Sequence, residues 1–246
     1  MQISFRLHFT SVDSTQTWVK KNLQQLPQGG VCLISAGSQT AGRGRFPSRK
    51  WFSPNEMGVY ATFCFFLSPT KEFFSLLGSL GLILAFSATP FLEKNGIFPK
   101  IKWPNDLFVG GKKIGGVLVE TTPMGDKLAV LAGIGVNLNG TEKMLQEVEK
   151  PATSMFLETH RLFSSSVGVK EIEVSFLQNL SLFLEGGFAP FLGSVQNRFY
   201  FQPGDRFSVQ LSDKKIFGEM RDLLSDGSLQ MLVDGKMLSL YSGEIM

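Results

Sequence analysis

The stretch Lys102-Trp103-Pro104-Asn105-Asp106 decides how this chain is interpreted. A brief strand over 100–103 must stop at Pro104, because proline cannot donate a hydrogen bond to a sheet. Two apolar segments follow, Leu107–Val109 and Lys112–Glu120, and the Gly110-Gly111 pair between them indicates a two-residue hairpin. Sites are often built from polar side chains at strand ends, so this stretch predicts both a sheet and a candidate site. A plain Pro-Asn-Asp turn with a surface lysine is the alternative.

The segments around this stretch indicate a sheet with helices and a small β-rich tail. Apolar runs at 31–35, 57–67 and 127–136 predict strands, and apolar periodicity predicts helices at 14–26, 142–149, 169–185 and 189–200. From Pro203 onward, short strands alternate with turns such as Ser225-Asp226-Gly227. We therefore expect a boundary near residues 199–203, with domains at 1–199 and 200–246.

Residues 73–92 raise the question of a membrane span, because twenty consecutive residues carry no charge. Serine, threonine, glycine and proline interrupt this run, and the flanking pairs Lys71-Glu72 and Glu93-Lys94 balance in charge and give no orientation signal. A helix that is apolar on all sides can also lie in the core of a large protein. We expect the core helix, and no membrane as partner.

Composition excludes several classes of protein. Of 246 residues, 43% are hydrophobic and 18% charged, which excludes a disordered chain or a coiled coil. Cys32 and Cys64 make no disulfide framework and fit a reducing cytoplasm. His8 and His160 are too few for a Cys/His zinc site and lie in no hydrolase motif. No protein-bound metal is expected.

Positive charge is concentrated in one part of the chain. Residues 14–55 contain six basic and no acidic residues, although the net charge of the whole chain is only +3. Within this region, Gly42-Arg43-Gly44-Arg45 precedes Arg49, Lys50 and Trp51. Glycines let a ligand approach the backbone, arginines offer donor forks to carboxylate or phosphate oxygens, and Trp51 offers a flat face for a base. A solvated basic loop or an RNA-binding patch is the alternative, and RNA binding would depend steeply on salt.

A third motif, Gly133-Ile134-Gly135-Val136-Asn137-Leu138-Asn139, is an apolar strand that ends in asparagines. Asparagine amides at such a strand end can hydrogen-bond the edge of a ligand. A capped turn is the alternative for this motif taken alone. Each motif taken alone has such an alternative, and only their combination indicates a function.

Together the motifs resemble those of biotin protein ligases. The run Gln39–Arg45 with Trp51–Pro54 resembles the glycine-rich adenylate loop of that family, and Lys102–Asp106 matches its most recognisable pentapeptide. Further matches in order and spacing are Asp13-Ser14-Thr15, Lys113–Glu120, Gly133–Asn137 and Gly243-Glu244-Ile245. The resemblance implies an α+β fold, a mixed sheet with flanking helices as in the biotin/lipoate ligase-like catalytic domain, followed by a small SH3-like β-barrel.

The resemblance also assigns residues to roles. Arg43, Lys102 and Asp106 would be catalytic: the two cations would meet the reacting carboxylate and α-phosphate, and Asp106 would position or deprotonate the attacking amine. Biotin would be held by Ser14, Thr15, Gln16, Gln39, Arg43, Gly44, Arg45, Lys102 and Gly116. ATP would be held by Arg43, Arg45, Trp51, Lys102, Asn105, Lys113 and Asn137. Gln16 stands where the family usually has asparagine.

The implied activity is that of an ATP-dependent biotin–[biotin carboxyl-carrier protein] ligase. Biotin and ATP, with Mg²⁺ on the phosphates, would form biotinyl-5′-AMP. A lysine of the biotin carboxyl carrier protein of acetyl-CoA carboxylase would then accept the biotin. A cytoplasmic protein without a nucleic-acid partner is expected, since the chain starts at the catalytic domain, and a homodimer is left open. A lipoate protein ligase of the same fold and a non-enzymatic biotin-sensing regulator are the alternatives.

Overall fold

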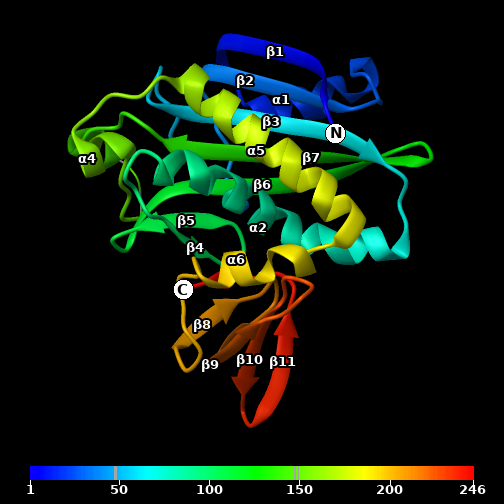
Figure 1. Ribbon diagram of the computed structural model, residues 1–246, viewed down its shortest axis with the longest axis vertical. Helices are drawn as coiled ribbons and strands as arrows, with labels where there is room; N and C mark the ends of the chain where they lie inside the picture. Colours follow the sequence, from blue (N-terminus) through cyan, green and yellow to red (C-terminus); the bar gives the residue numbers. More distant parts are fainter. Residues whose placement is uncertain (47–48, 147, 149) are drawn as a thin grey trace.

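The computed structural model describes residues 1–46, 49–146, 148 and 150–246. Its larger part is a seven-stranded sheet in the order β1-β2-β3-β7-β6-β5-β4 (Figure 1). The β1 and β2 strands pair in parallel, and all other neighbours pair antiparallel, so the sheet is mixed as predicted. The strands are β1 (Ile3–Val12), β2 (Val31–Gln39), β3 (Gly58–Leu67), β4 (Lys100–Lys102), β5 (Asp106–Val109), β6 (Lys112–Met124) and β7 (Lys127–Asn137).

Helices cover both faces of this sheet, because side chains alternate along each strand between the two faces. On one face, α1 (Thr15–Asn22) and the short 3-10 helix η1 (Leu23–Gln25) pack against Cys32, Ile34 and Leu131. On the other face, α2 (Lys71–Glu93) and α5 (Ser165–Gly186) pack against the neighbouring positions Leu33, Phe63 and Val130. The remaining helices are α3 (Glu142–Leu145), α4 (Met155–Thr159), η2 (Ala189–Phe191) and α6 (Leu192–Gln196).

The long apolar segment forms a core helix, as expected. In α2, Leu80, Leu82, Ile83 and Leu84 are buried in the main hydrophobic core. Throughout the chain as described, we find no helix long and apolar enough to cross a membrane.

Local signals in the sequence explain where several elements begin and turn. The Ser14 side chain accepts a hydrogen bond from Thr17 N and so caps α1. The Gly110-Gly111 pair turns the predicted hairpin with φ values of 54° and 78°, which side chains other than glycine adopt rarely. The first hairpin strand thereby brings Asp106 opposite Gly116.

The chain after residue 203 forms a second, five-stranded antiparallel sheet in the order β11-β10-β9-β8-β12, consistent with the SH3-like module that the sequence predicted (Figure 1). Its strands are β8 (Arg206–Gln210), β9 (Lys215–Leu223), β10 (Leu229–Val233), β11 (Lys236–Leu240) and β12 (Glu244–Ile245). Trp103 Nε1 donates to Gly227 O at 3.1 Å and joins the two sheets. Side chains such as Phe207 and Met231 belong to the same continuous core as those of α2.

Four elements differ from the sequence prediction. Residues 189–200 form η2 and the short α6 instead of one helix, and the helix expected at 142–149 is assigned only over Glu142–Leu145. Residues 147 and 149 lie outside the described residues. The β1 strand and the α4 helix were not predicted; β1 lies at the edge of the sheet, and the alternation of its apolar residues from Ile3 to Phe9 with polar ones is a strand signal that the prediction did not use.

Candidate functional site

A cavity of about 680 Å³ brings the predicted site residues together, and its size suits a small-molecule ligand. The lining includes Ser14, Thr15, Gln16, Gln39, Arg43, Gly44, Arg45, Trp51, Lys102, Asn105, Asp106, Lys113 and Gly116. Asn137 is not among the lining residues, and its Nδ2 donates to Thr153 O at 2.9 Å. Three motifs that lie far apart in the sequence therefore meet at one cavity.

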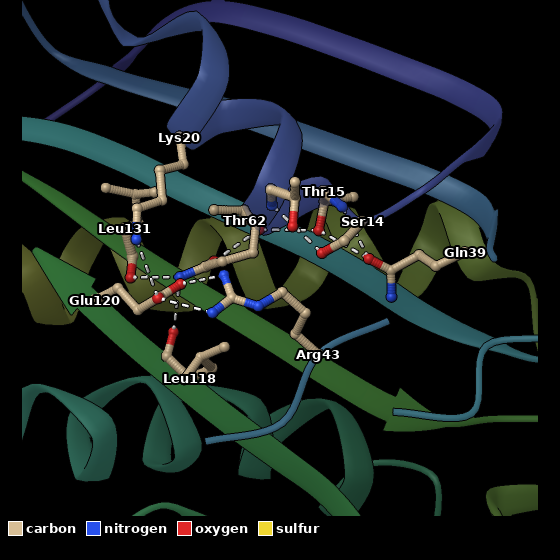
Figure 2. A network of polar contacts seen from close by, with 11 residues as sticks. Ser14, Thr15, Lys20, Gln39, Arg43, Thr62, Leu118, Glu120 and Leu131 are labelled. Atoms are coloured by element: carbon tan, nitrogen blue, oxygen red, sulfur yellow. Dashed lines mark hydrogen bonds and ion pairs between the residues drawn. The ribbon is translucent and has the colours of Figure 1, made fainter. Parts of the chain in front are cut away.

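One part of the cavity is lined by neutral hydrogen-bonding groups (Figure 2). Ser14 and Thr15 lie at the start of α1, and both are almost fully buried. The Thr15 backbone N donates to Gln39 Oε1 at 2.9 Å, and the Thr15 hydroxyl lies 3.2 Å from the same oxygen. Gln39 Nε2 in turn donates to Ser53 Oγ at 2.9 Å. This network joins the first helix to the end of β2 and to the loop that follows it.

Gln16 lies behind this network, and the protein itself engages its amide. Gln16 Nε2 donates to Leu131 O at 3.2 Å and to Leu118 O at 3.4 Å, while its Oε1 accepts from Thr62 Oγ1 at 3.1 Å. A Cβ atom at Gly133 would lie 2.7 Å from Gln16 Oε1, so glycine is what leaves room for this amide. Sequence reasoning missed Thr62, because a threonine within an apolar strand gives no signal.

Lys102 defines the charged part of the cavity. No ion pair or hydrogen bond of the described chain engages its ammonium, which lies 5.1 Å from the Phe108 ring centroid and 5.9 Å from those of Tyr200 and Phe201. Burial lowers the pKa of Lys102, and the nearby charge of Asp106 partly offsets this effect. An unpaired, desolvated cation in a cavity is suited to an anionic ligand.

Further charged groups surround Lys102 and are paired with one another. Asp106 Oδ1 lies 2.7 Å from Lys113 Nζ, and Glu244 Oε1 lies 3.4 Å from Arg49 and 2.5 Å from Lys150. Burial favours a higher pKa for Glu244, but the hydrogen bond and charge of Lys150, with other cations, lower it overall. No pattern in the sequence points to Lys150, and Glu244 belongs only to the terminal motif Gly243-Glu244-Ile245.

The two arginines of the glycine-rich loop point to different partners. Arg43 forms a two-pronged ion pair with Glu120 of β6, with N–O distances of 3.0 and 3.1 Å (Figure 2). Arg45 Nη1 donates to Gly243 O at 2.8 Å, so the loop contacts the second sheet. Burial lowers the pKa of Arg45, and Asp106 and Glu244 partly offset the effect. The loop is thus held from both sides of the cavity mouth.

Trp51 lies flat on the sheet beside Lys113. A Cβ atom at Gly135 would come within 2.3 Å of the Trp51 ring, so this glycine makes room for the indole. Lys113 Nζ lies 5.5 Å from the centroid of that ring, and the buried Trp51 Nε1 has no hydrogen-bond partner among the described residues. The two glycines of the Gly133-Ile134-Gly135 motif therefore accommodate Gln16 and Trp51 side by side.

The carboxylates of the site are not arranged as a metal centre. Within residues that the structure describes, no group of three or more His, Cys, Asp or Glu side chains could hold a metal ion. The nearest candidates, Asp106 and Glu244, are paired with lysines.

Comparison with protein families gives one match. The model of the biotin/lipoate A/B protein ligase family matches residues 8–137, which is more than half of the chain and includes the first two motifs and the third as far as Asn137. The match begins within β1 and ends at the last residue of β7.

Individual relatives extend the similarity over nearly the whole chain. The bifunctional ligase/repressor BirA of Escherichia coli is 29% identical over 95% of this chain and 71% of its own length. The biotin–[acetyl-CoA-carboxylase] ligase of Mycobacterium tuberculosis is 26% identical over 88% of this chain and 78% of its own. Among solved structures, the biotin protein ligase of Aquifex aeolicus in complex with biotin and ATP is 30% identical, with a TM-score of 0.78 over 99% of this chain and 98% of that one.

Proposed function

Because the chain belongs to the biotin/lipoate A/B protein ligase family, we infer that it is a biotin protein ligase, which uses ATP to attach biotin to a carrier protein. One observation carries this conclusion: a single cavity joins the neutral groups around Thr15 to the unpaired cation of Lys102. Biotin has the matching halves, a neutral ureido ring and a carboxylate on a short chain.

In the first step, a carboxylate oxygen of biotin attacks the α-phosphorus of ATP, and the bond to pyrophosphate breaks. Two anions must approach one another, so the main requirement is positive charge that is in place before reaction. Lys102 supplies that charge beside the reacting atoms, and Arg45 supplies a second cation from the loop. Arg43 also lines the cavity, with its guanidinium paired to Glu120. Asn105, Lys113 and Trp51 line the same cavity and serve as candidate ATP contacts.

In the second step, the amine of an acceptor lysine attacks the carbonyl carbon of biotinyl-5′-AMP, and AMP leaves. The amine must be neutral, although the pKa of a free lysine is about 10.4. Asp106 is a carboxylate that lines the cavity, and it receives the role of positioning the amine or accepting its proton. In the structure Asp106 Oδ1 is paired with Lys113 Nζ at 2.7 Å, so in this role Asp106 would replace that ion pair with a contact to the acceptor amine.

Mg²⁺ is expected to enter with ATP and to neutralise its phosphates. The donor set described above does not form a protein-bound magnesium cage, because Asp106 and Glu244 are both paired with lysines. Mg²⁺ often keeps most of its waters and binds mainly through substrate phosphates. The contribution of this chain is therefore its cations and its closed cavity.

The acceptor, the compartment and the assembly complete the proposal. The name of the M. tuberculosis relative supports acetyl-CoA carboxylase as the enzyme whose biotin carboxyl carrier protein is modified. The two buried, unpaired cysteines suit the reducing cytoplasm. A homodimer and the absence of a nucleic-acid partner remain parts of the proposal to be measured by sedimentation and by gel shift.

ATP-dependent incorporation of labelled biotin into a purified carrier domain tests the function. Labelled lipoate with a lipoyl carrier domain is the parallel arm, since a lipoate ligase shares the fold. We expect biotin transfer that requires ATP, and little lipoate transfer. Transfer of lipoate alone would show that the neutral end of the cavity has been assigned to the wrong ring.

A further inference from the structure

Gln16 and Thr62 lie at the neutral end of the cavity, are hydrogen-bonded to each other, and take no part in the two steps above. Figure 2 shows Thr62 beside Thr15. We propose that these residues are positioning residues: they fix the direction of the hydrogen bonds at Thr15, so that its hydroxyl presents lone pairs to the ligand and selects an N–H donor. The inference rests on the proposed function and assigns the chemistry that the ligand must offer at Thr15.

The direction is set first at Gln16. Its Nε2 lies 3.2 Å from Leu131 O and 3.4 Å from Leu118 O, and backbone carbonyls can only accept hydrogen bonds. The reverse orientation of the amide would place its oxygen against two other acceptors. Gln16 Oε1 must therefore face Thr62, and the single hydroxyl proton of Thr62 is donated to it over 3.1 Å.

The direction is then passed to Thr15. Its Oγ1 lies 2.9 Å from Thr62 Oγ1, whose proton is already used, and 3.2 Å from Gln39 Oε1. Gln39 Oε1 is fixed as an acceptor, because it receives the backbone N–H of Thr15, and Gln39 Nε2 faces Ser53 Oγ. Both neighbours of the Thr15 hydroxyl are thus acceptors. Its proton turns into the protein, and its lone pairs remain for the ligand.

Donors lie next to this acceptor. Ser14 Oγ accepts from Thr17 N at 3.4 Å, and no hydrogen bond of the described chain uses its own proton. Gln39 Nε2 has a second proton beyond the one given to Ser53. The site therefore offers an acceptor beside two donors, which matches an N–H group adjacent to a carbonyl, as in a cyclic urea. A dithiolane ring provides neither group.

A pair of substitutions distinguishes this directional role from simple packing. In Gln16→Met, Thr62 loses its acceptor and turns its proton toward Thr15 Oγ1, where it takes one of the two lone pairs of that oxygen and leaves only one for the ligand N–H. Biotin should bind about tenfold more weakly, the usual worth of one neutral hydrogen bond. Adding Thr62→Val removes the competing proton, so the double variant Gln16→Met/Thr62→Val should bind biotin more tightly than Gln16→Met. Residues in contact need not have additive effects, so the deciding observation is the recovery itself: a packing defect alone should leave the double variant binding biotin no better than Gln16→Met.

The experiment is calorimetric titration of biotin into the wild type, both single variants and the double variant, with ATP affinity and melting temperature measured for each. Thr122→Val is the matched control, since Thr122 Oγ1 is also buried but lies outside the cavity. We expect partial recovery in the double variant, unchanged ATP affinity, and no effect in the control. A double variant that binds biotin no better than Gln16→Met overturns the inference.

Two further outcomes have clear meanings. A wild type that does not bind biotin contradicts the proposed function itself, whereas additive losses on a biotin-binding wild type overturn only the present inference. If Gln16→Met fails to fold, Thr62→Val alone decides: Thr15 can still donate to Gln39, so its loss of biotin affinity should stay below about threefold. A loss of tenfold or more in that variant contradicts the directional role.

Discussion

Lys102 is the residue on which the first chemical step most depends. Its ammonium is half-buried among aromatic rings and has no carboxylate bound to it in the described chain. Removing one charge that is in place before reaction commonly costs about 10²–10³ in rate. We expect Lys102→Ala to lower biotin-dependent pyrophosphate release by this factor, measured in a coupled assay. Lys100→Ala, an exposed lysine on the same strand, is the control and should retain near wild-type release.

Asp106 should affect the pH dependence of that first step. Burial lowers the pKa of Lys102, and the negative charge of Asp106 raises it again in part. If protonated Lys102 is required, the rate falls as pH rises through this pKa. Asp106→Asn removes the offsetting charge, so the alkaline limb of pyrophosphate release should move to lower pH.

Measuring pyrophosphate release without carrier protein separates this effect from the role of Asp106 in transfer. We expect adenylate formation to persist in Asp106→Asn near neutral pH, while transfer to the carrier falls more strongly. An alkaline limb that stays in place, or moves to higher pH, contradicts the electrostatic coupling between Asp106 and Lys102.

At this scale the sequence predicted the reactive groups better than their partners. Lys102, Thr15 and Gln39, which the motifs single out because each lies in a run whose spacing is distinctive, all line one cavity. The motifs did not reveal Thr62 or Glu120 as partners, since a hydrogen bond across strands depends on register and not on any local pattern. The roles of the individual residues remain predictions.

The glycine-rich loop is the element that should retain the reactive intermediate. Arg45 ties this loop to the second sheet through Gly243 O at 2.8 Å. In Arg45→Gly, we expect biotinyl-5′-AMP to form but to escape several-fold faster, because one anchor of the closed loop is lost. Biotin labelling of lysines on a bystander protein measures this escape.

The control for this variant is Arg161→Gly, which changes an arginine that bonds Asn95 and lies outside the cavity. The Arg161→Gly variant should biotinylate the carrier and leave the bystander protein unlabelled. If Arg45→Gly also stays selective for the carrier, retention of the adenylate must come from another contact of the loop.

Some elements followed directly from local signals in the sequence, and others were missed. The α2 helix followed from a long run of uncharged residues, α5 from apolar periodicity, and the β5–β6 hairpin from Gly110-Gly111. The β1 strand was missed although its apolar residues alternate with polar ones, which is the period of a strand. Phe5, Leu7 and Phe9 pack against the smaller core cluster, while the backbone of β1 pairs with β2 at the sheet edge. The prediction of a single helix at 189–200 was wrong. Ala189–Phe191 forms a 3-10 helix that contains Pro190, and the α6 helix begins only after it.

At the scale of the whole molecule, the two sheets share one core. Residues of the second sheet, such as Phe207 and Met231, pack in the same hydrophobic cluster as Leu80 and Ile101 of the larger part. Gly243–Ile245 also line the cavity. The proposed boundary at residues 199 and 200 therefore separates two sheets but not two independent cores, and sequence texture alone could not distinguish these cases.

This shared core predicts that the protein unfolds in one calorimetric transition, and that biotin raises the melting temperature of the whole chain. Ligand at 100 times its Kd adds about 2.7 kcal/mol, or about 5–10 °C for a chain of this size. Trp103→Phe removes the buried hydrogen bond to Gly227 O. This substitution should lower the free energy of unfolding by about 1–3 kcal/mol and leave a single transition. Scanning calorimetry with and without biotin measures both effects. A second transition that biotin does not move would show that residues 200–246 unfold by themselves, because a ligand stabilises only the unit whose native state binds it.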